Sequence, residues 1–217
     1  MGSVEGGGIQ TGGGLPVLMR YRRILRTCAG SVITAITFIL ASPVYVNDVS
    51  GVAKTWIDRL AYVCHRPAFA GKSAYLIATV AASPTRHTLR SMEIPLYTWG
   101  FHIAGKAGYR MGALMPSEQI ERRCGRKAGR AARALFEAVR KRRFLRPSLV
   151  SLMMLKIQQG SWQRGKDRSS RDYLYWRNQG WLNPGRTFFI AHRASPVKVA
   201  LARLVGAVVL RLVTSGD

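Results

Sequence analysis

Two long apolar runs dominate the first half of the chain. One occupies residues 32–41 and is rich in β-branched side chains, and the other occupies residues 72–83 and ends in small residues. Apolar runs of this length without polar alternation are typical of strands that are buried on both faces of a parallel sheet. Each run is followed, after a short loop, by apolar positions that recur every three or four residues, as in an amphipathic helix. The pattern therefore predicts two strand–loop–helix units.

The helical segments extend this alternation. Residues 84–99 predict a second helix, residues 100–112 a third strand and residues 116–143 a long helix, for which Ser117 is the candidate N-cap. The first helix has its apolar stripe at Val52, Trp56, Leu60 and Cys64. Strands that alternate with helices predict an α/β fold with a parallel sheet, whose strands we expect near 33–41, 73–80 and 101–107.

The pattern changes after Pro147. A segment that is apolar on nearly all sides is followed by an aromatic and basic segment and then by a C-terminal helix at about 196–213, with Ser195 as its N-cap. We expect this helix to pack through Leu201, Leu204 and Val208 against protein. The predicted organisation is a flexible or aberrant N-terminal segment, an α/β domain and a mostly helical C-terminal extension, at residues 1–31, 32–146 and 147–217.

The charge is strongly positive. The chain carries 34 Lys and Arg against 10 Asp and Glu, a formal net charge of +24. Such a balance favours nucleic acid, an anionic membrane face or phosphorylated small molecules as partners. The three cysteines are scattered without a CxxC pair, which argues against a disulfide framework or a structural zinc site and favours a cytoplasmic location. The basic and apolar N-terminal region imitates a signal peptide, but its apolar run is too short to span a bilayer.

Residues 42–51 have the composition of a binding loop. They follow the first buried strand and precede a helix, and ligands of parallel sheets bind outside the carboxyl ends of the strands. Tyr45 offers a flat aromatic surface, Asn47 and Ser50 offer hydrogen-bonding groups, and Gly51 permits close backbone approach. These residues suit a planar heteroaromatic ligand, although Pro, Asn, Asp and Gly also serve to shape turns.

The sequence of this loop resembles a known family. "SPVYVNDVSGVAKTWIDR" (42–59) closely resembles the flavin-ring loop of the flavodoxin-like NAD(P)H-dependent FMN reductases, with its S-P-x-Y-x-x-x-x-S-G-x-x-K-x-x-I-D-R pattern. The resemblance implies a flavodoxin-like parallel sheet with flanking helices, FMN as the cofactor, NAD(P)H as the hydride donor, a small electron acceptor such as a quinone or a flavin, and a homo-oligomer. The cofactor-binding residues that it implies are Ser42, Pro43, Val44, Tyr45, Asn47, Ser50, Gly51, Ala82 and Ser83.

One part of the family pattern has no counterpart here. The family begins with a strand that ends in a G-S-x-R-x-x-S-x-T-like phosphate loop, and residues 1–31 contain no such motif. We therefore expect the N-terminal strands of the fold to be missing and the strand at 32–41 to lie at an edge of the sheet. We also expect FMN to bind weakly, with an affinity close to that of riboflavin.

Two alternatives to flavin chemistry stay open. The first is nucleic-acid binding, in which aromatic residues stack on bases while neighbouring arginines contact phosphates. The residues concerned are Tyr173, Tyr175, Trp176, Trp181 and Phe188 with Arg171, Arg177 and Arg186. The second is attachment to a membrane surface through residues 196–214. The four histidines show no metal-ligand spacing, and the chain offers no obvious catalytic acid or nucleophile.

Overall fold

The structure, a computed structural model, describes residues 37–112, 115–141 and 145–214. Residues 36–217 form one compact unit. The predicted flexible segment at 1–31 and the beginning of the first predicted strand lie outside the described residues. The predicted division between an α/β domain and a C-terminal extension stays a prediction.

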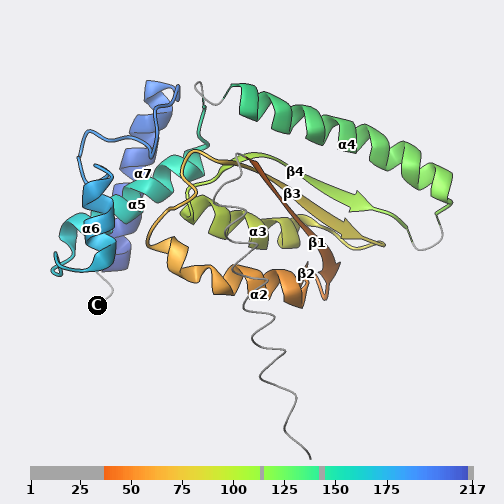
Figure 1. Cartoon of the computed structure of the whole chain (residues 1–217), viewed down its shortest axis with the longest axis horizontal. Helices are drawn as coiled ribbons and strands as arrows, with labels where there is room; N and C mark the ends of the chain where they lie inside the picture. The colour runs from red at the N-terminus through yellow and green to blue at the C-terminus, as the bar shows by residue number, and fades with distance from the viewer. Residues whose placement is uncertain (1–36, 113–114, 142–144, 215–217) are drawn as a thin grey trace, which may run out of the picture. The chain divides into compact units, whose positions relative to one another are not determined.

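The sheet has four strands in the order β2-β1-β3-β4 (Figure 1). Three of them are parallel neighbours: β1 (Thr37–Tyr45), β3 (Ser73–Val80) and β4 (His102–Arg110). The fourth, β2 (Asp48–Val49), pairs antiparallel with the end of β1. The α/β fold class and the three parallel strands are thus confirmed.

Helices cover both faces of this sheet. On one face lie α2 (Gly51–Arg59), the 3₁₀ helix η1 (Ala61–Cys64) and α3 (Arg86–Thr98), and on the other lies α4 (Ser117–Arg140) (Figure 1). Rings from both helices and strands fill the space under α2, because Phe38 stacks on Trp56 and on Phe101 at 5.3 and 5.9 Å between ring centroids. The largest fully buried side chains of this layer are those of Val63, Phe69, Leu76, Met92, Leu96, Trp99 and Phe101.

Two details of these helices differ from the prediction. Ser117 is the first helical residue of α4, whereas Pro116 occupies the N-cap position and provides no side-chain cap. Val52 was expected on the buried stripe of α2 but is 69% exposed. The helix α2 ends after Arg59, and the contacts with the core come instead from Trp56 and from Leu60 and Val63 beyond its end.

The N-terminal half of β1 lies at an edge. No other described strand pairs with Thr37–Pro43 on the side opposite β3. Ile39 is 53% exposed in consequence, although its neighbour Leu40 is buried against the helices of the other face. This placement agrees with the edge position expected from the sequence.

The C-terminal extension consists of α5 (Leu149–Arg164), α6 (Arg171–Asn178) and α7 (Pro196–Thr214). An aromatic cluster lies at its centre, where Trp176 contacts Trp181 and Phe189 edge-on at 5.4 and 6.0 Å. The full set of buried residues in this cluster is Leu145, Leu152, Leu155, Trp176, Trp181, Phe188, Phe189 and Ala202.

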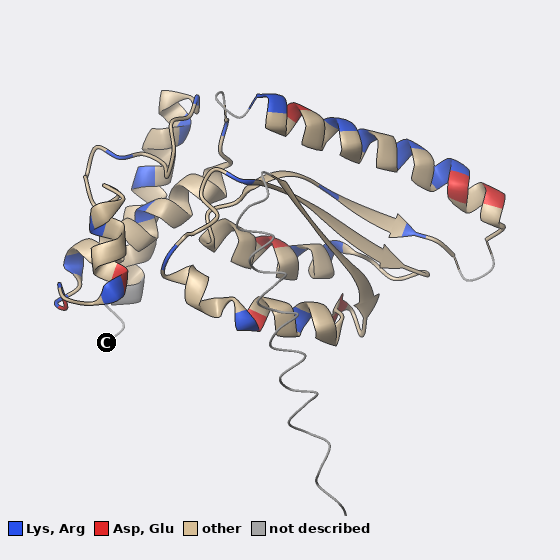
Figure 2. Ribbon diagram, viewed as in Figure 1, with Lys and Arg blue, Asp and Glu red and all other residues tan. Residues whose placement is uncertain are grey.

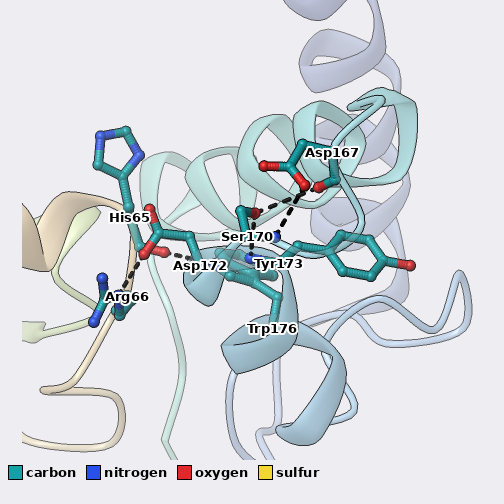
Figure 3. Close-up of polar contacts among 7 residues, drawn as sticks. All are labelled: His65, Arg66, Asp167, Ser170, Asp172, Tyr173 and Trp176. Carbon is teal, nitrogen blue, oxygen red and sulfur yellow. Dashed lines mark hydrogen bonds and ion pairs between the residues drawn. The ribbon is translucent and has the colours of Figure 1, made fainter.

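Polar contacts attach α6 to the end of η1 (Figure 3). The indole N–H of Trp176 donates to the carbonyl of His65 at 2.8 Å, and Arg66 forms an ion pair with Asp172. At the start of α6, the Ser170 hydroxyl accepts from the backbone N–H of Tyr173 at 3.2 Å and so caps the helix. The extension is therefore fixed to the sheet layer by side chains from both parts of the chain.

The predicted packing face of α7 is wrong. Leu201, Leu204 and Val208 are 45–65% exposed, and α7 contacts α5 instead through the opposite side, on which Ala202 and Leu210 are buried. The contact is close because Gly160 of α5 has no side chain: a Cβ there would lie 2.2 Å from Leu210 Cδ2. Since α7 is apolar on most sides, its periodicity did not distinguish the two faces. The N-cap was correct, because Ser195 Oγ accepts from the Lys198 N–H at 3.3 Å.

Candidate functional site at the carboxyl edge of the sheet

The predicted loop at 42–51 is a β-hairpin rather than a free loop. Ser42 and Pro43 continue β1 and lie opposite Ala78 and Thr79 of β3. Beyond them β1 turns back on itself, and Tyr45 pairs with Asp48 across a two-residue turn. Proline is tolerated in this position because β1 is an edge strand here and the missing N–H has no ladder partner.

The turn of the hairpin has an uncommon backbone. Val46 and Asn47 have φ values of 48° and 66°, both in the left-handed region. Two-residue hairpin turns of this kind favour Asn and Gly, whereas a β-branched residue such as valine is strained there. The side chain of Val46 is fully exposed and packs against nothing. Backbone strain of this sort, about 1–3 kcal/mol, is found most often at ligand-binding sites.

Two of the predicted site residues hold the base of the hairpin. The Ser42 hydroxyl is buried, accepts from the Ser50 N–H at 2.9 Å and donates to the Pro43 carbonyl at 2.8 Å. The Ser50 hydroxyl accepts from the Ala53 N–H at 3.3 Å and caps α2. These two hydroxyls therefore position the hairpin and do not face solvent as ligand groups.

The remaining residues present an open surface. Tyr45 is 62% exposed, Asn47 is exposed at the tip, and a Cβ added at Gly51 would meet no atom within 4 Å. Nothing inside the fold requires glycine at that position. An aromatic ring, an amide and an unobstructed stretch of backbone thus lie together at the end of β1.

The second predicted loop joins this surface. Residues 81–84 are exposed and leave β3 at the same edge at which β1 ends. Two backbone hydrogen bonds connect the beginning of this loop to the end of β4, from the Met111 N–H to the Val80 carbonyl and from the Gly112 N–H to the Ala81 carbonyl, both at 2.9 Å. Ala82 and Ser83 therefore lie at the edge of the sheet at which the hairpin also lies, and their part in one shared site stays a prediction.

The beginning of α3 connects the two loops. The Thr88 hydroxyl donates to the Asn47 carbonyl at 3.4 Å, and His87 Nδ1 lies 3.8 Å from Asp48 Oδ1. A hydrogen bond from Ser91 lowers the pKa of Asp48, and the Val49 N–H and His87 act in the same direction. Asp48 is consequently ionised at neutral pH and helps to hold the hairpin against α3.

A basic cavity at the same edge was missed by the sequence interpretation. It has a volume of about 270 Å³ and is lined by Thr85, Gly108, Tyr109, Arg110, Arg123, Cys124 and Lys127. The available signal was the spacing of Arg123, Lys127 and Arg130, which places three basic side chains on one side of α4.

The segment that contains the hairpin is similar to a known protein family. Residues 22–111 match the family of NADPH-dependent FMN reductases. The matched segment includes the hairpin, the loop at 81–84 and all of β3 and β4. It confirms the resemblance that the loop sequence suggested.

A solved structure offers a second comparison. The chain is similar to an NADH:FMN oxidoreductase in its apo form, with a TM-score of 0.39 and 19% sequence identity over 55% of this chain and 60% of that chain. The chain thus spans less than two thirds of the length of that enzyme. The comparison with curated protein sequences found no match.

The residues at the hairpin fit the ring end of FMN. Tyr45 provides a flat exposed ring, Asn47 an exposed amide, and Gly51 an approach free of side chains. A planar ring with polar edges needs an aromatic wall and nearby donors, and the hairpin offers both. The hairpin therefore fits the flavin ring, and other residues would have to bind the phosphate of the cofactor.

The aromatic segment does not offer the stacking surface that the nucleic-acid alternative required. Trp176, Trp181 and Phe188 are at most 4% exposed, and Tyr173 is 8% exposed. Trp176 packs on Trp181, Phe188 packs on Phe189, and the Tyr173 ring lies against Arg168, so these rings leave no open face for a base. Within the described ranges, none of the helices combines the length and the hydrophobicity needed to cross a membrane.

Proposed function

We propose that this chain is a flavin-dependent NAD(P)H oxidoreductase that binds the FMN ring at the hairpin. The observation that carries the proposal is the coincidence of the FMN reductase segment with the exposed edge formed by the hairpin and residues 81–84. When bound, FMN supplies the redox chemistry, accepting hydride from the nicotinamide and passing electrons to a small acceptor such as a quinone or another flavin.

The residues of the hairpin divide this work between binding and support. The exposed ring of Tyr45 lies against one side of the flavin, and the Asn47 amide and the backbone around Ala82 and Ser83 provide hydrogen-bonding groups. Pro43 and Val44 shape the strand beneath Tyr45. Ser42 and Ser50 close the hairpin through the hydrogen bonds described above, so that the ring-facing groups are ordered before the ligand arrives.

We also propose that FMN binds more weakly here than in relatives with a phosphate loop. The sequence contains no G-S-x-R-x-x-S-x-T-like motif. Each charge-assisted hydrogen bond to a phosphate contributes about 1.5–3 kcal/mol, so the loss of two costs about two to four orders of magnitude in affinity. If no other residues bind the phosphate, FMN and riboflavin, which lacks the phosphate, should bind with similar affinities.

Two broader features belong to the same proposal. A homo-oligomer is supported by the apolar residues that remain exposed on α7, among them Val197, Leu204 and Leu212 at 65–77% exposure. Sedimentation velocity tests the oligomeric state directly. A cytoplasmic location is supported by the three cysteines without a disulfide framework.

Titration with riboflavin and FMN tests the flavin site. Tyr45→Ala should weaken the binding of both ligands about tenfold, because the loss of one stacked ring costs about 1–3 kcal/mol. Tyr62→Ala is the matched control, since Tyr62 is similarly exposed at 58% but lies on η1, away from the hairpin. The proposal fails if neither flavin binds, or if the two variants weaken binding equally.

A further inference from the structure

The basic cavity between α4 and the end of β4 is the strongest unassigned feature of the molecule. Arg110 comes from the last position of β4, whereas Arg123 and Lys127 come from the first half of α4. A second, more open hollow adjoins it on the helix, lined by Arg123, Arg126, Lys127 and Arg130. The two hollows share Arg123 and Lys127, so they form one continuous basic surface.

The charges of this surface are unpaired, in contrast to those at both ends of the same helix. Near the beginning of α4, Arg122 pairs with Glu118 at 3.6 Å, and at its end Glu137 pairs with Arg140 and Lys141 at 3.1 and 2.8 Å. Among the described residues, no carboxylate lies within ion-pair distance of the basic residues that line the two hollows. The separation is clear in Figure 2, where the blue segments in the middle of α4 have no red neighbour.

This arrangement costs stability unless an anion binds. Arg123 and Lys127 are four residues apart, as are Arg126 and Arg130, and like charges at this spacing destabilise a helix by about 0.2–0.5 kcal/mol per pair. Glu121 does not relieve the repulsion, because residues two positions apart in a helix, such as Glu121 and Arg123, point to different sides. The surface is therefore complementary to a ligand with more than one negative charge.

Lys127 is held in place at the cavity. Its ammonium group donates to the Gly108 carbonyl at 2.9 Å and lies 5.7 Å from the ring centroid of Tyr109. Gly108 leaves room for Thr85, because a Cβ on this glycine would lie 2.0 Å from the Thr85 hydroxyl. A fixed cation, a hydroxyl and the guanidinium groups of Arg110 and Arg123 thus line the same cavity.

The position of the cavity relates it to the flavin edge. Thr85 lines the cavity and directly follows the loop at 81–84, which forms part of the candidate flavin surface. A ligand bound on that loop can therefore reach the cavity without crossing the sheet. Inorganic anions would satisfy the charge, but this position favours an anionic group that belongs to a nucleotide cofactor.

We propose that Arg110, Arg123 and Lys127 form a binding site for the phosphate group of a nucleotide cofactor. The inference rests on the proposed function, since the two cofactors of that reaction, NADPH and FMN, both carry phosphate esters. Arginine forks and a lysine are the side chains that bind phosphate most strongly. The site would compensate in part for the phosphate loop that the sequence lacks.

Direct binding measurements test this site without relying on turnover. Adenosine 2′,5′-bisphosphate represents the phosphate end of NADPH, and adenosine 5′-monophosphate is its comparison ligand. FMN and riboflavin form the second pair. Arg123→Gln and Arg110→Gln should each weaken the binding of the phosphate-bearing ligand about tenfold or more, the loss expected for one charge-assisted bond. Calorimetry gives these affinities, and thermal denaturation verifies that the variants are folded.

Arg133→Gln is the matched control. This substitution removes the same charge from the same helix. Arg133 lies about 15 Å from Arg123 along the helix axis and lines neither hollow. If adenosine 2′,5′-bisphosphate binding is lost in the Arg123 and Arg110 variants but kept in Arg133→Gln, the site binds the phosphate of the dinucleotide. Loss of a preference for FMN over riboflavin assigns it to the flavin phosphate.

Two results would overturn the proposal. One is unchanged binding of both phosphate-bearing ligands in the Arg123 and Arg110 variants. The other is an equal loss in Arg133→Gln, which would indicate diffuse attraction of polyanions along α4 rather than a site. Riboflavin binding separates these results from a failure of the proposed function, because it depends on the ring surface at Tyr45 and not on the basic cavity.

Discussion

The hairpin at residues 42–51 and the aromatic segment of the C-terminal extension share several residue types but lie in opposite environments. Both combine aromatic rings with Asn, Gly, Pro and charged residues. In the hairpin the ring of Tyr45 is 62% exposed, whereas in the extension Trp176 is completely buried. Aromatic residues among polar ones therefore do not identify a binding surface. What distinguishes the two regions is whether neighbouring elements cover the rings.

The position of each ring in the fold explains why Trp176 is buried and Tyr45 is exposed. Trp176 lies in the last turn of α6, and the following residues of the extension cover it, with Trp181 and Phe189 in contact. Tyr45 lies at the end of an edge strand, where only the two-residue strand β2 follows. Segments that follow α6 in the chain bury its ring, while the tip of a hairpin leaves the ring of Tyr45 in solvent.

Substitution of the buried tryptophan should have the largest effect on stability. Trp176→Ala removes the centre of the aromatic cluster and the 2.8 Å hydrogen bond to His65, and we expect the free energy of unfolding to fall by about 3–5 kcal/mol. Urea denaturation measures this loss. Tyr45→Ala should change stability by no more than about 0.5 kcal/mol, because its ring is in solvent. Similar losses in both variants would show that the two rings are not in different environments.

An effect of intermediate size is expected at the contact between α5 and α7. In Gly160→Ala the new methyl group would lie 2.2 Å from Leu210 Cδ2, so Leu210 must move, and we expect a loss of about 1–3 kcal/mol. Gly125→Ala in the exposed part of α4 is the control, since a Cβ there meets nothing within 4 Å. That control should gain about 0.5–1 kcal/mol from helix propensity. A gain in both variants would mean that α7 does not pack closely on α5.

The smallest effect is expected at the tip of the hairpin. Val46→Gly relieves the left-handed strain of about 1–3 kcal/mol but adds about 0.5–1 kcal/mol of chain entropy to the unfolded state. We expect a net gain of about 1 kcal/mol in thermal denaturation. A clear loss of stability would show that Val46 is not strained and that the hairpin turn has another geometry.

Much of the sheet layer could be predicted from the sequence. The runs at 32–41 and 72–83 predicted strands, and the described parts of both lie in strands, of which β3 is buried as expected while Ile39 of β1 is 53% exposed. The pattern around Tyr45 also indicated the resemblance to the FMN reductases, whose family model matches residues 22–111. These features depend on local composition and periodicity, and the fold preserved them.

The tertiary structure decided the rest. The sequence did not show that Ser42 is buried within its own hairpin, or that α7 packs through Ala202 and Leu210 and exposes Leu201. It also did not show that Arg110 joins Arg123 and Lys127 around one cavity. Periodicity locates an apolar face only when the other face is polar, and α7 has no such contrast. Residues distant in the sequence form a site only when the packing of strands and helices brings them together.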